Sequence, residues 1–499
     1  MPAVVMPAVV ISVSAAAEPS NRSVWPAVAA FACALAARLW GIGDKPFWLD
    51  ELTTLRRAAL PMGALIRDSL SYHHLPTYFA LLSGVLALGQ SEAVARAPSA
   101  VLGAVTCAFV AAAAMRVGGR AAGLLAGLLM AFSPIQVQYG QEARSYTLVM
   151  CCIAAALLGL LRLVEEPARD ADRAGWALLL GGTFGAVATL GIALAWPAAS
   201  TLGWALATRD TRRRGRWRTW LLGHAAVAVL IAPWFAAMYV LNEGRMADGL
   251  TWIPPLDADR LWATFDTVYL MRIGSLISTH LFPAGVPGLG ALVALLAVAS
   301  GVWAWRRRRA AFAVLAVAAL LPPVALLAVS TVFPLWIPRY LLWGAVPFFV
   351  LAGLGANLAP PAARLPGALA AGVLAAINLG GYYGAETKPR WDQAAQALHA
   401  RATPRDLVLV EDDRLPDLLN YFLALDGAPL AERRWTLDPA VARAWLAGGS
   451  PVWLAQGAVG QVVLADPAVI PPALQLPERP ALLLRFGRDV ALLRFDPPP

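Results

Sequence analysis

Long apolar runs dominate this sequence and limit what it can fold into. Runs of about 17 to 25 apolar residues can cross a lipid bilayer as helices. We count eleven such segments: 24–42, 97–115, 120–136, 146–163, 174–191, 193–208, 219–241, 284–305, 310–331, 340–357 and 365–383. The composition agrees, because 59% of the 499 residues are hydrophobic and only 14% are charged, against about 25% charged in ordinary soluble domains. We therefore expect a mainly α, polytopic membrane protein and exclude a soluble chain.

The arginines indicate which loops face the cytoplasm. The loop from Arg209 to Arg218 has six arginines and one aspartate, and Arg306 to Arg309 are four consecutive arginines. Basic residues collect in cytoplasmic loops, so the net charge of +9 reports topology rather than nucleic-acid binding. Successive loops lie on opposite sides of the membrane, so counting spans from these two cytoplasmic loops places residues 1–23 inside. The same count places the following outside: loop 43–96, turn 137–145, loop 242–283, turn 332–339 and the C-terminal part. The short apolar segment 76–90 is then a re-entrant or juxtamembrane helix on the outer side.

An acidic pair follows an aromatic anchor in the first outer loop. Asp50 and Glu51 come directly after Phe47-Trp48-Leu49 and begin a predicted amphipathic helix. Its apolar side carries Leu52, Leu55, Ala59 and Leu60, and Arg56 and Arg57 are expected to face water or lipid headgroups. Acidic residues at a helix start also complement the helix dipole, so the pair alone does not define a site.

Other ionisable and aromatic residues are predicted on the same outer face. They are His73, His74, Tyr78, Gln141, Glu142, Arg144, Tyr146, Arg339 and Tyr340. Taken singly, each has a structural explanation as an interfacial anchor or a snorkelling side chain. Together with the acidic pair they suit a transferase with a membrane-embedded phosphate donor. A carboxylate can take the proton of an acceptor hydroxyl, and arginine matches the leaving phosphate. Direct displacement with one carboxylate would invert the anomeric carbon.

Carboxylates and histidines on this face could also hold a metal ion. The candidates are Asp50, Glu51, Glu142, His73 and His74, but no spacing matches a dedicated site. The sequence predicts no metal site and no certain cofactor, and a divalent metal stays open.

Several motifs together resemble the multispanning, lipid-phosphosugar-dependent glycosyltransferases of the GT-C class, specifically family 39, which includes protein O-mannosyltransferases and aminoarabinose transferases. The matching motifs are Trp48-Leu49-Asp50-Glu51, His73-His74-Leu75-Pro76-Thr77-Tyr78-Phe79, Arg96-Ala97-Pro98-Ser99, Ser133-Pro134, Tyr139-Gly140-Gln141-Glu142-Ala143-Arg144-Ser145-Tyr146, Trp252-Ile253-Pro254-Pro255 and Pro338-Arg339-Tyr340-Leu341-Leu342. The Gln-Glu-Ala-Arg-x-Tyr element is the most specific of them.

The resemblance implies roles for individual residues. Asp50 would be the catalytic base, Glu51 would position it or the acceptor, and Arg144 and Arg339 would hold the lipid phosphate. The remaining residues assigned to the donor or substrate site are His74, Tyr78, Arg96, Gln141, Glu142, Tyr146 and Tyr340.

The C-terminal residues 385–499 differ from the rest, with 12 basic and 14 acidic side chains. Short apolar runs at 406–410, 452–455 and 462–465 predict strands, 481–486 and 490–495 a hairpin, and 415–425 a helix. We expect a small soluble α/β domain on the outer face that shapes acceptor access. The predicted division is then a cytoplasmic segment 1–23, a transmembrane catalytic domain 24–384 and this domain.

The sequence therefore predicts an integral-membrane glycosyltransferase of the inner membrane. It would move a sugar from a polyprenyl-phosphate donor to a hydroxyl of a lipid, glycan or protein acceptor on the periplasmic face. Transfer of a preassembled glycan by a ligase or polymerase stays open. A transporter or lipid flippase is the alternative of another class, but it predicts inverted repeats and charges near the midplane, and the sequence shows neither pattern.

Overall fold

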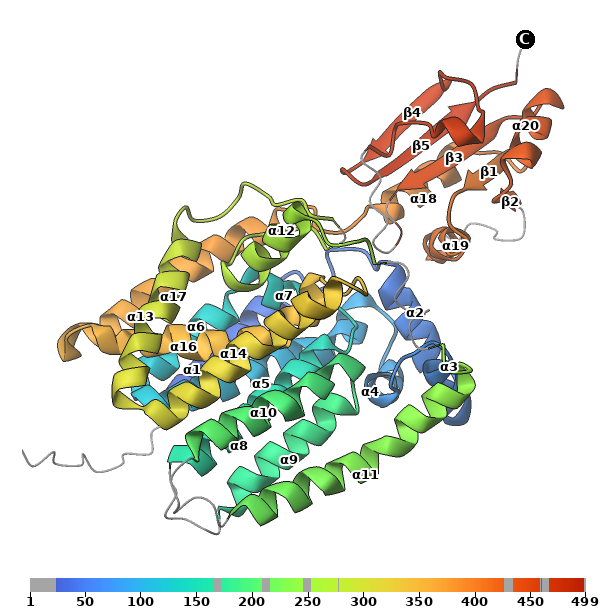
Figure 1. Cartoon of the computed structure of the whole chain (residues 1–499). Helices are drawn as coiled ribbons and strands as arrows, with labels where there is room; N and C mark the ends of the chain where they lie inside the picture. The colour runs from blue at the N-terminus through green and yellow to red at the C-terminus, as the bar shows by residue number, and fades with distance from the viewer. Residues whose placement is uncertain are drawn as a thin grey trace, which may run out of the picture.

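The computed structural model describes residues 24–165, 172–208, 216–245, 253–276, 278–425, 434–457, 459 and 466–497. It has a bundle of helices and, beyond one end of the bundle, a smaller part built on a β-sheet (Figure 1). Four predicted features lie wholly or partly outside the described residues: the segment 1–23, most of the arginine loop 209–218, Trp252 and the strand at 462–465.

Helices occupy all eleven predicted membrane segments. They are α1 (Trp25–Leu39), α5 (Glu92–Gly118), α6 (Arg120–Ala131) with α7 (Pro134–Gly140), α8 (Tyr146–Glu165), α9 (Arg173–Val187), α10 (Ala195–Ala207), α11 (Trp217–Leu241), α13 (Leu289–Arg307), α14 (Arg309–Ser330), α15 (Pro338–Leu341) with α16 (Ala345–Leu354), and α17 (Pro361–Tyr383). Within the described residues, seven helices are long and apolar enough to cross a membrane, or eight if α6 and α7 form one bent span. The chain is thus a multi-pass membrane protein.

Three of the eleven predicted spans are shorter than expected. Helices α1, α9 and α10 have 15, 15 and 13 residues. At about 1.5 Å per residue each is roughly 20 Å long, less than the hydrocarbon core of about 30 Å. The apolar run 174–208 divides because α9 ends at Val187 and a short 3-10 helix (Gly191–Leu194) precedes α10.

Three short helices follow α1 in the first predicted outer loop. They are α2 (Leu49–Ala58), α3 (Met62–Ser71) and α4 (Thr77–Leu86). Helix α4 has ten residues, so it is about 15 Å long and cannot cross a bilayer. The expectation that Arg57 faces water or headgroups is wrong. Its side chain is 4% exposed and its Nε lies 2.6 Å from Asp68 Oδ2, because α3 turns back against α2.

A sharp break separates α6 from α7, and Arg38 of α1 braces it. The two helices are bent by 63°. The buried Arg38 guanidinium donates to the carbonyl oxygens of Ala131, at 3.2 Å, and Gln136, at 3.3 Å, one on each side of the break. The bond to Ala131 satisfies a carbonyl at the end of α6 that a continuous helix would have paired, and the bond to Gln136 ties Arg38 to α7. Helix α7 therefore leads directly into the turn 141–145.

The C-terminal part contains a five-stranded sheet. Its elements are α18 (Trp391–Arg401), β1 (Leu407–Val410), α19 (Leu415–Leu425), β2 (Arg434–Thr436), α20 (Pro439–Ala447), β3 (Val452–Gly457), β4 (Leu482–Phe486) and β5 (Val490–Phe495). The strand order is β2-β1-β3-β5-β4. Strand β1 pairs in parallel with β2 and β3, and β5 pairs antiparallel with β3 and β4. The predicted hairpin is β4–β5, whereas α18, α20 and β2 were not predicted.

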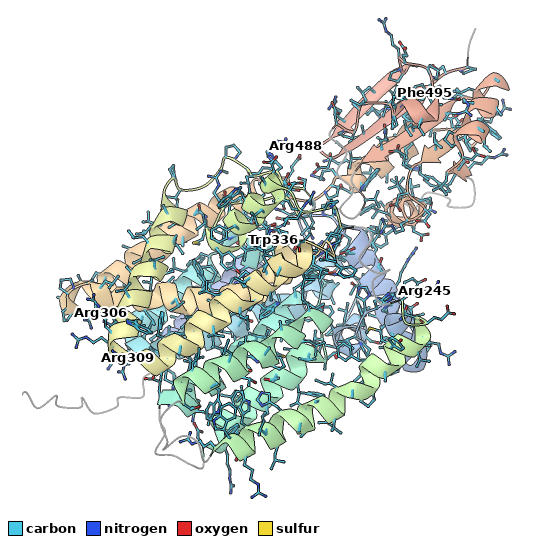
Figure 2. All side chains as sticks on the ribbon, viewed as in Figure 1. Arg245, Arg306, Arg309, Trp336, Arg488 and Phe495 are labelled. Carbon is cyan, nitrogen blue, oxygen red and sulfur yellow. The ribbon has the colours of Figure 1, made fainter. Side chains whose placement is uncertain are left out.

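The predicted cytoplasmic arginines and the sheet lie at opposite ends of the molecule. Arg306 and Arg309 lie at the end of the bundle farthest from the sheet, whereas Trp336 and Arg488 lie toward the sheet (Figure 2). Helix α12 (Ala258–Tyr269) also lies at the sheet end (Figure 1). A shared apolar cluster joins the two parts, because side chains of α2 and α4 pack in it with α18 and α19.

Candidate active site at the sheet end of the bundle

Asp50 lies in the first turn of α2 between two arginines from distant parts of the chain. Its Oδ2 is 2.6 Å from Arg339 Nη1 and 3.4 Å from Arg144 Nη2. The Asp50 side chain is 22% exposed, whereas those of Arg339 and Arg144 are 4% and 11% exposed. Burial would raise the pKa of Asp50, but the two guanidiniums outweigh it and hold this pKa below its usual range. The carboxylate is therefore ionised and accessible.

Helix α2 and the aromatic residues near it hold the two arginines. Arg144 Nη1 donates to the Asp50 carbonyl at 3.3 Å and to Thr54 Oγ1 at 3.1 Å. Arg144 Nη2 donates to the Tyr146 hydroxyl at 3.4 Å. The Arg339 guanidinium lies 5.9 Å from the centre of the buried Trp48 ring. The arginines are thus held by groups other than Asp50.

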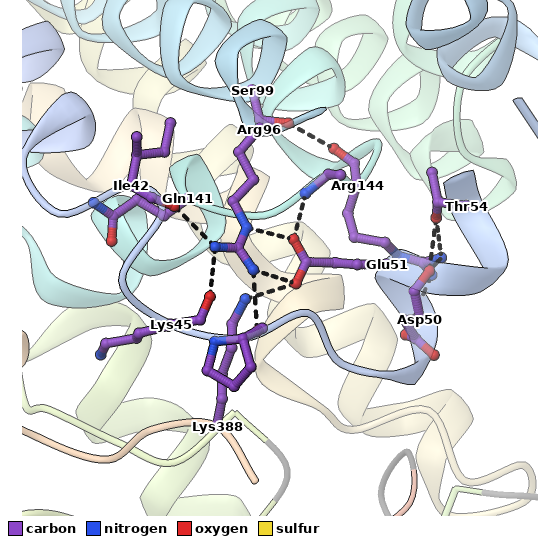
Figure 3. A network of polar contacts seen from close by, with 12 residues as sticks. Ile42, Lys45, Asp50, Glu51, Thr54, Arg96, Ser99, Gln141, Arg144 and Lys388 are labelled. Atoms are coloured by element: carbon purple, nitrogen blue, oxygen red, sulfur yellow. Dashed lines mark hydrogen bonds and ion pairs between the residues drawn. The ribbon is translucent and has the colours of Figure 1, made fainter. Parts of the chain in front are cut away.

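Glu51 is the centre of a second, fully buried network (Figure 3). Arg96 approaches it with two nitrogens, Nε to Oε1 at 2.8 Å and Nη2 to Oε2 at 2.9 Å. Lys388 Nζ lies 2.8 Å from Oε2, and the amide of Ala143 donates to Oε1 at 3.0 Å. Burial opposes ionisation, but Arg96 and Lys388 hold the pKa of Glu51 below its usual range. Glu51 is 0% exposed and joins α2 to the 141–145 turn through the Ala143 amide.

Glu142 lies beside this network without a hydrogen-bond partner among the described residues. It is 0% exposed, and neither carboxylate oxygen is paired in the described part of the chain. Burial and the nearby Glu51 raise the pKa of Glu142 to about 7, against the opposing effect of Lys388. Both oxygens of Glu142 therefore face the protein interior, and its substrate contact stays a prediction.

Gln141 and Tyr78 also use their polar atoms within the protein. Gln141 Nε2 donates to the carbonyls of Arg38 and Trp40, and its oxygen accepts from the hydroxyl of Tyr382 at 3.0 Å. The Tyr78 hydroxyl shares a hydrogen bond of 2.8 Å with Ser99, which donates to the Arg144 carbonyl. These residues support the site rather than line it.

The two histidines differ in their surroundings. His74 Nδ1 lies 2.5 Å from the Tyr72 carbonyl oxygen, and burial together with Arg144 lowers the pKa of His74 to about 3. His73 instead has a left-handed backbone (φ 60°) and contacts the Arg245 carbonyl at 3.0 Å. His74 lies close enough to Asp50 and Arg144 for an electrostatic interaction with both.

The predicted residues thus form two layers and a support. Asp50, Arg144, Tyr146, Arg339, Tyr340 and His74 form the layer around the partly exposed Asp50 carboxylate, and the side chains of Arg144, Tyr146 and Arg339 in it are themselves buried. Glu51, Arg96 and Glu142 lie behind it with Lys388. Lys388 and Thr54 were not predicted. The sequence signal for Lys388 was faint, a lone lysine in Glu-Thr-Lys-Pro-Arg next to the last apolar run.

Cations, rather than further metal-ligating side chains, surround the carboxylates of the site. Among the residues that the structure describes, no group of three or more His, Cys, Asp or Glu side chains is placed to hold a metal ion. The partners of Asp50 and Glu51 are arginine and lysine. What the arrangement offers chemically is an ionised carboxylate beside two guanidiniums, a base next to an anion-binding pair.

The chain is a mainly helical, multi-pass bundle with this site at one end and a small sheet beyond it, and it is similar to known proteins in sequence and in fold. The model of the family described as dolichyl-phosphate-mannose-protein mannosyltransferase matches residues 73–236 of the 499. This stretch includes Arg96 and Arg144 but not Asp50, Glu51 or Arg339. Among curated protein sequences, none matches the chain.

Solved structures show the same fold over most of the chain. The apo structure of ArnT from Cupriavidus metallidurans matches with a TM-score of 0.56 and 15% identity, covering 94% of this chain and 97% of that one. ArnT from the same organism bound to undecaprenyl phosphate matches with a TM-score of 0.53 and 16% identity, covering 93% and 97%. An oligosaccharyltransferase of Archaeoglobus fulgidus, in complex with Zn and sulfate, matches with a TM-score of 0.51 and 16% identity, covering 82% of this chain and 58% of that one. The solved structures thus show that this chain has the GT-C fold, and residues 73–236 are similar to the mannosyltransferase family.

Proposed function

We propose that this chain is a glycosyltransferase that uses a sugar linked to a polyprenyl phosphate and transfers it to an acceptor hydroxyl. The observation that carries the proposal is the partly exposed carboxylate of Asp50 between the buried guanidiniums of Arg144 and Arg339. Asp50 is the general base in this proposal, and the two arginines hold the donor phosphate.

Donor binding would prepare the base. A phosphate can offer each guanidinium fork two oxygens, whereas Arg339 and Arg144 now share the single Oδ2 of Asp50 at 2.6 and 3.4 Å. When the phosphate takes over Arg144 and Arg339, Asp50 loses the charges that depress its pKa, and its affinity for a proton rises. Asp50 thus becomes a better base only when the donor is present.

The chemical step is then a direct displacement. Asp50 takes the proton of the acceptor hydroxyl, and the acceptor oxygen forms a bond to the anomeric carbon. The bond from that carbon to the phosphate oxygen breaks, and the polyprenyl phosphate leaves with the electron pair. Arg144 and Arg339 stabilise the negative charge that develops on it. A single attack from the opposite side inverts the anomeric carbon.

Two comparisons support a lipid-phosphate donor. ArnT from Cupriavidus metallidurans has been solved bound to undecaprenyl phosphate, and the matching family is described by a dolichyl-phosphate-linked sugar.

The proposed location is the outer face of the inner membrane. Arg306 and Arg309 lie at the opposite end of the bundle from the sheet (Figure 2), and basic loops are retained in the cytoplasm. Labelling of a cysteine placed at the exposed Met62 of α3 in intact cells would support this. Labelling of a cysteine at position 306 but not at 62 would contradict it.

The function is tested by mass spectrometry of lipids, lipopolysaccharide and protein glycans from a deletion strain. The proposal predicts that one sugar disappears from one class of glycoconjugate and that the wild-type gene restores it. Loss of a whole glycan would favour the ligase or polymerase instead. Loss of every glycan that depends on one lipid carrier, with normal transfer in detergent extracts, would favour a flippase.

A further inference from the structure

The segment between α17 and α18 is held against the first loop by two lysines that point in opposite directions along the chain. Lys45 of the loop donates to the carbonyls of Tyr382 and Ala385 and to Thr387 Oγ1, at 3.2, 3.1 and 2.9 Å. Lys388 of the segment reaches back to Glu51 at 2.8 Å. We call residues 382–388, which include Lys388, together with Lys45 the lysine clamp.

The burial of Lys388 indicates that the lysine clamp does more than attach the segment to the first loop. Its side chain is 2% exposed, and taking an ammonium out of water is costly unless it is paired. An apolar side chain could attach the segment without this cost. The charge is placed where Glu51, already bound by Arg96, lies beside the second buried carboxylate of Glu142. Two buried cations, Arg96 and Lys388, therefore lie near the two buried carboxyl groups. Lys388 helps to keep Glu51 ionised beside Glu142.

The same helix that carries Asp50 is contacted by the C-terminal part on its other side. The rings of Phe47 and Tyr421 lie 5.9 Å apart, and Arg56 Nη1 is 2.7 Å from Asp417 Oδ2. Leu49 and Leu52 of α2 share an apolar cluster with α19. Helix α2 is thus held at Glu51 by Lys388, and α19 contacts it at Arg56 and in the shared apolar cluster.

We propose that Lys388 is a positioning residue for the reaction, acting through Glu51, and that the C-terminal part thereby completes the active site. Glu51 follows Asp50 directly in the first turn of α2, so a displacement of Glu51 moves the base relative to Arg144 and Arg339. This inference rests on the proposed function. It gives the C-terminal part a role in holding the base, in addition to any effect on acceptor access.

The test compares purified variants added to solubilised membranes of the deletion strain, which retain both donor and acceptor. Lys388→Met is expected to lower turnover about 100-fold, the loss that a misplacement of about 1 Å can cause. Its affinity for undecaprenyl phosphate, measured by tryptophan fluorescence, should stay within about threefold, because Arg144 and Arg339 are untouched. Lys388→Arg keeps the charge, so its turnover should be at least about tenfold higher than that of Lys388→Met.

Arg390→Met is the matched control. Arg390 lies two residues away on the same segment but pairs with Asp392, so turnover should stay near the wild-type value. A Lys388→Met turnover within about threefold of wild type, in a preparation where Asp50→Asn is inactive, overturns the inference. Wild-type turnover by Asp50→Asn would instead overturn the proposed function.

A second variant decides the question if Lys388→Met does not insert. Tyr421→Ala removes the contact of this partly buried ring of α19 with Phe47, two residues before α2, and leaves every charge of the site in place. Reduced turnover with unchanged affinity for undecaprenyl phosphate supports the inference. Unchanged turnover contradicts a role of the C-terminal part in holding α2.

Discussion

Replacement of Glu51 by glutamine removes the charge that neutralises two buried cations. The carboxylate has partners at 2.8 and 2.9 Å on Arg96, at 2.8 Å on Lys388 and at 3.0 Å on the Ala143 amide. A glutamine keeps the shape, but its NH2 group cannot accept from these donors. Removal of one partner of a buried ion pair costs about 3 to 5 kcal/mol. We expect Glu51→Gln to lower the free energy of unfolding by this amount.

The assay is thermal unfolding of the detergent-purified protein, with a decrease in midpoint on the order of 5 °C at pH 7. The folded pKa of Glu51 lies below its usual value. Its contribution is therefore complete above about pH 4.5 and is lost as the pH falls toward the folded pKa, so the decrease should shrink in acid. Asp50→Asn should cost less stability, because Asp50 is 22% exposed.

A triple variant tests the physical reason. Glu51→Gln combined with Arg96→Met and Lys388→Met removes the cations together with the anion, and replacement of a whole buried ion group is often close to neutral. The triple variant should therefore be more stable than Glu51→Gln alone. A Glu51→Gln midpoint within about 1 °C of wild type, or a triple variant less stable than the single one, would refute the reasoning.

Two further predictions concern pH and packing. The folded pKa of Glu142 is raised to about 7, so its neutral form stabilises the fold at low pH and this stability is lost as the pH rises through 7. Glu142→Gln should gain thermal stability relative to wild type between pH 5 and pH 8, and an unchanged difference across that range would count against it. A Cβ at Gly140 would lie 2.7 to 2.9 Å from side-chain atoms of Arg38, which is held by carbonyl groups. Gly140→Ala should therefore cost about 1 to 3 kcal/mol. Gly84→Ala in α4, where a Cβ meets nothing within 4 Å, should cost nothing in the same thermal assay.

The sequence was most informative about the helices. Apolar runs such as 146–163 and 310–331 predicted α8 and α14 because lipid requires both apolar side chains and internally paired backbone. The lengths of α1, α9 and α10 were not predictable in the same way, because the residue at which a helix ends inside an apolar run depends on its packing. The 63° bend after α6 falls at Pro134, which cannot continue a helix, whereas the contacts of Arg38 across the bend have no local sequence signal.

The composition of the site was predictable, but its layering was not. Motifs placed Asp50, Arg144 and Arg339 on one face, and the structure brings them into contact. The sequence could not predict which of Asp50 and Glu51 is buried. Adjacent residues of a helix point in different directions, and the neighbouring elements decide which of them is covered. Lys388 was missed because its partner is 337 residues away.

The central claim is that Asp50 is the base for sugar transfer. The most direct measurement is turnover of purified Asp50→Asn in solubilised membranes of the deletion strain, read as the return of the missing sugar by mass spectrometry. The variant should fold, bind undecaprenyl phosphate through Arg144 and Arg339, and transfer at least about 100-fold more slowly than wild type. Turnover of Asp50→Asn within a few-fold of wild type would contradict the assignment.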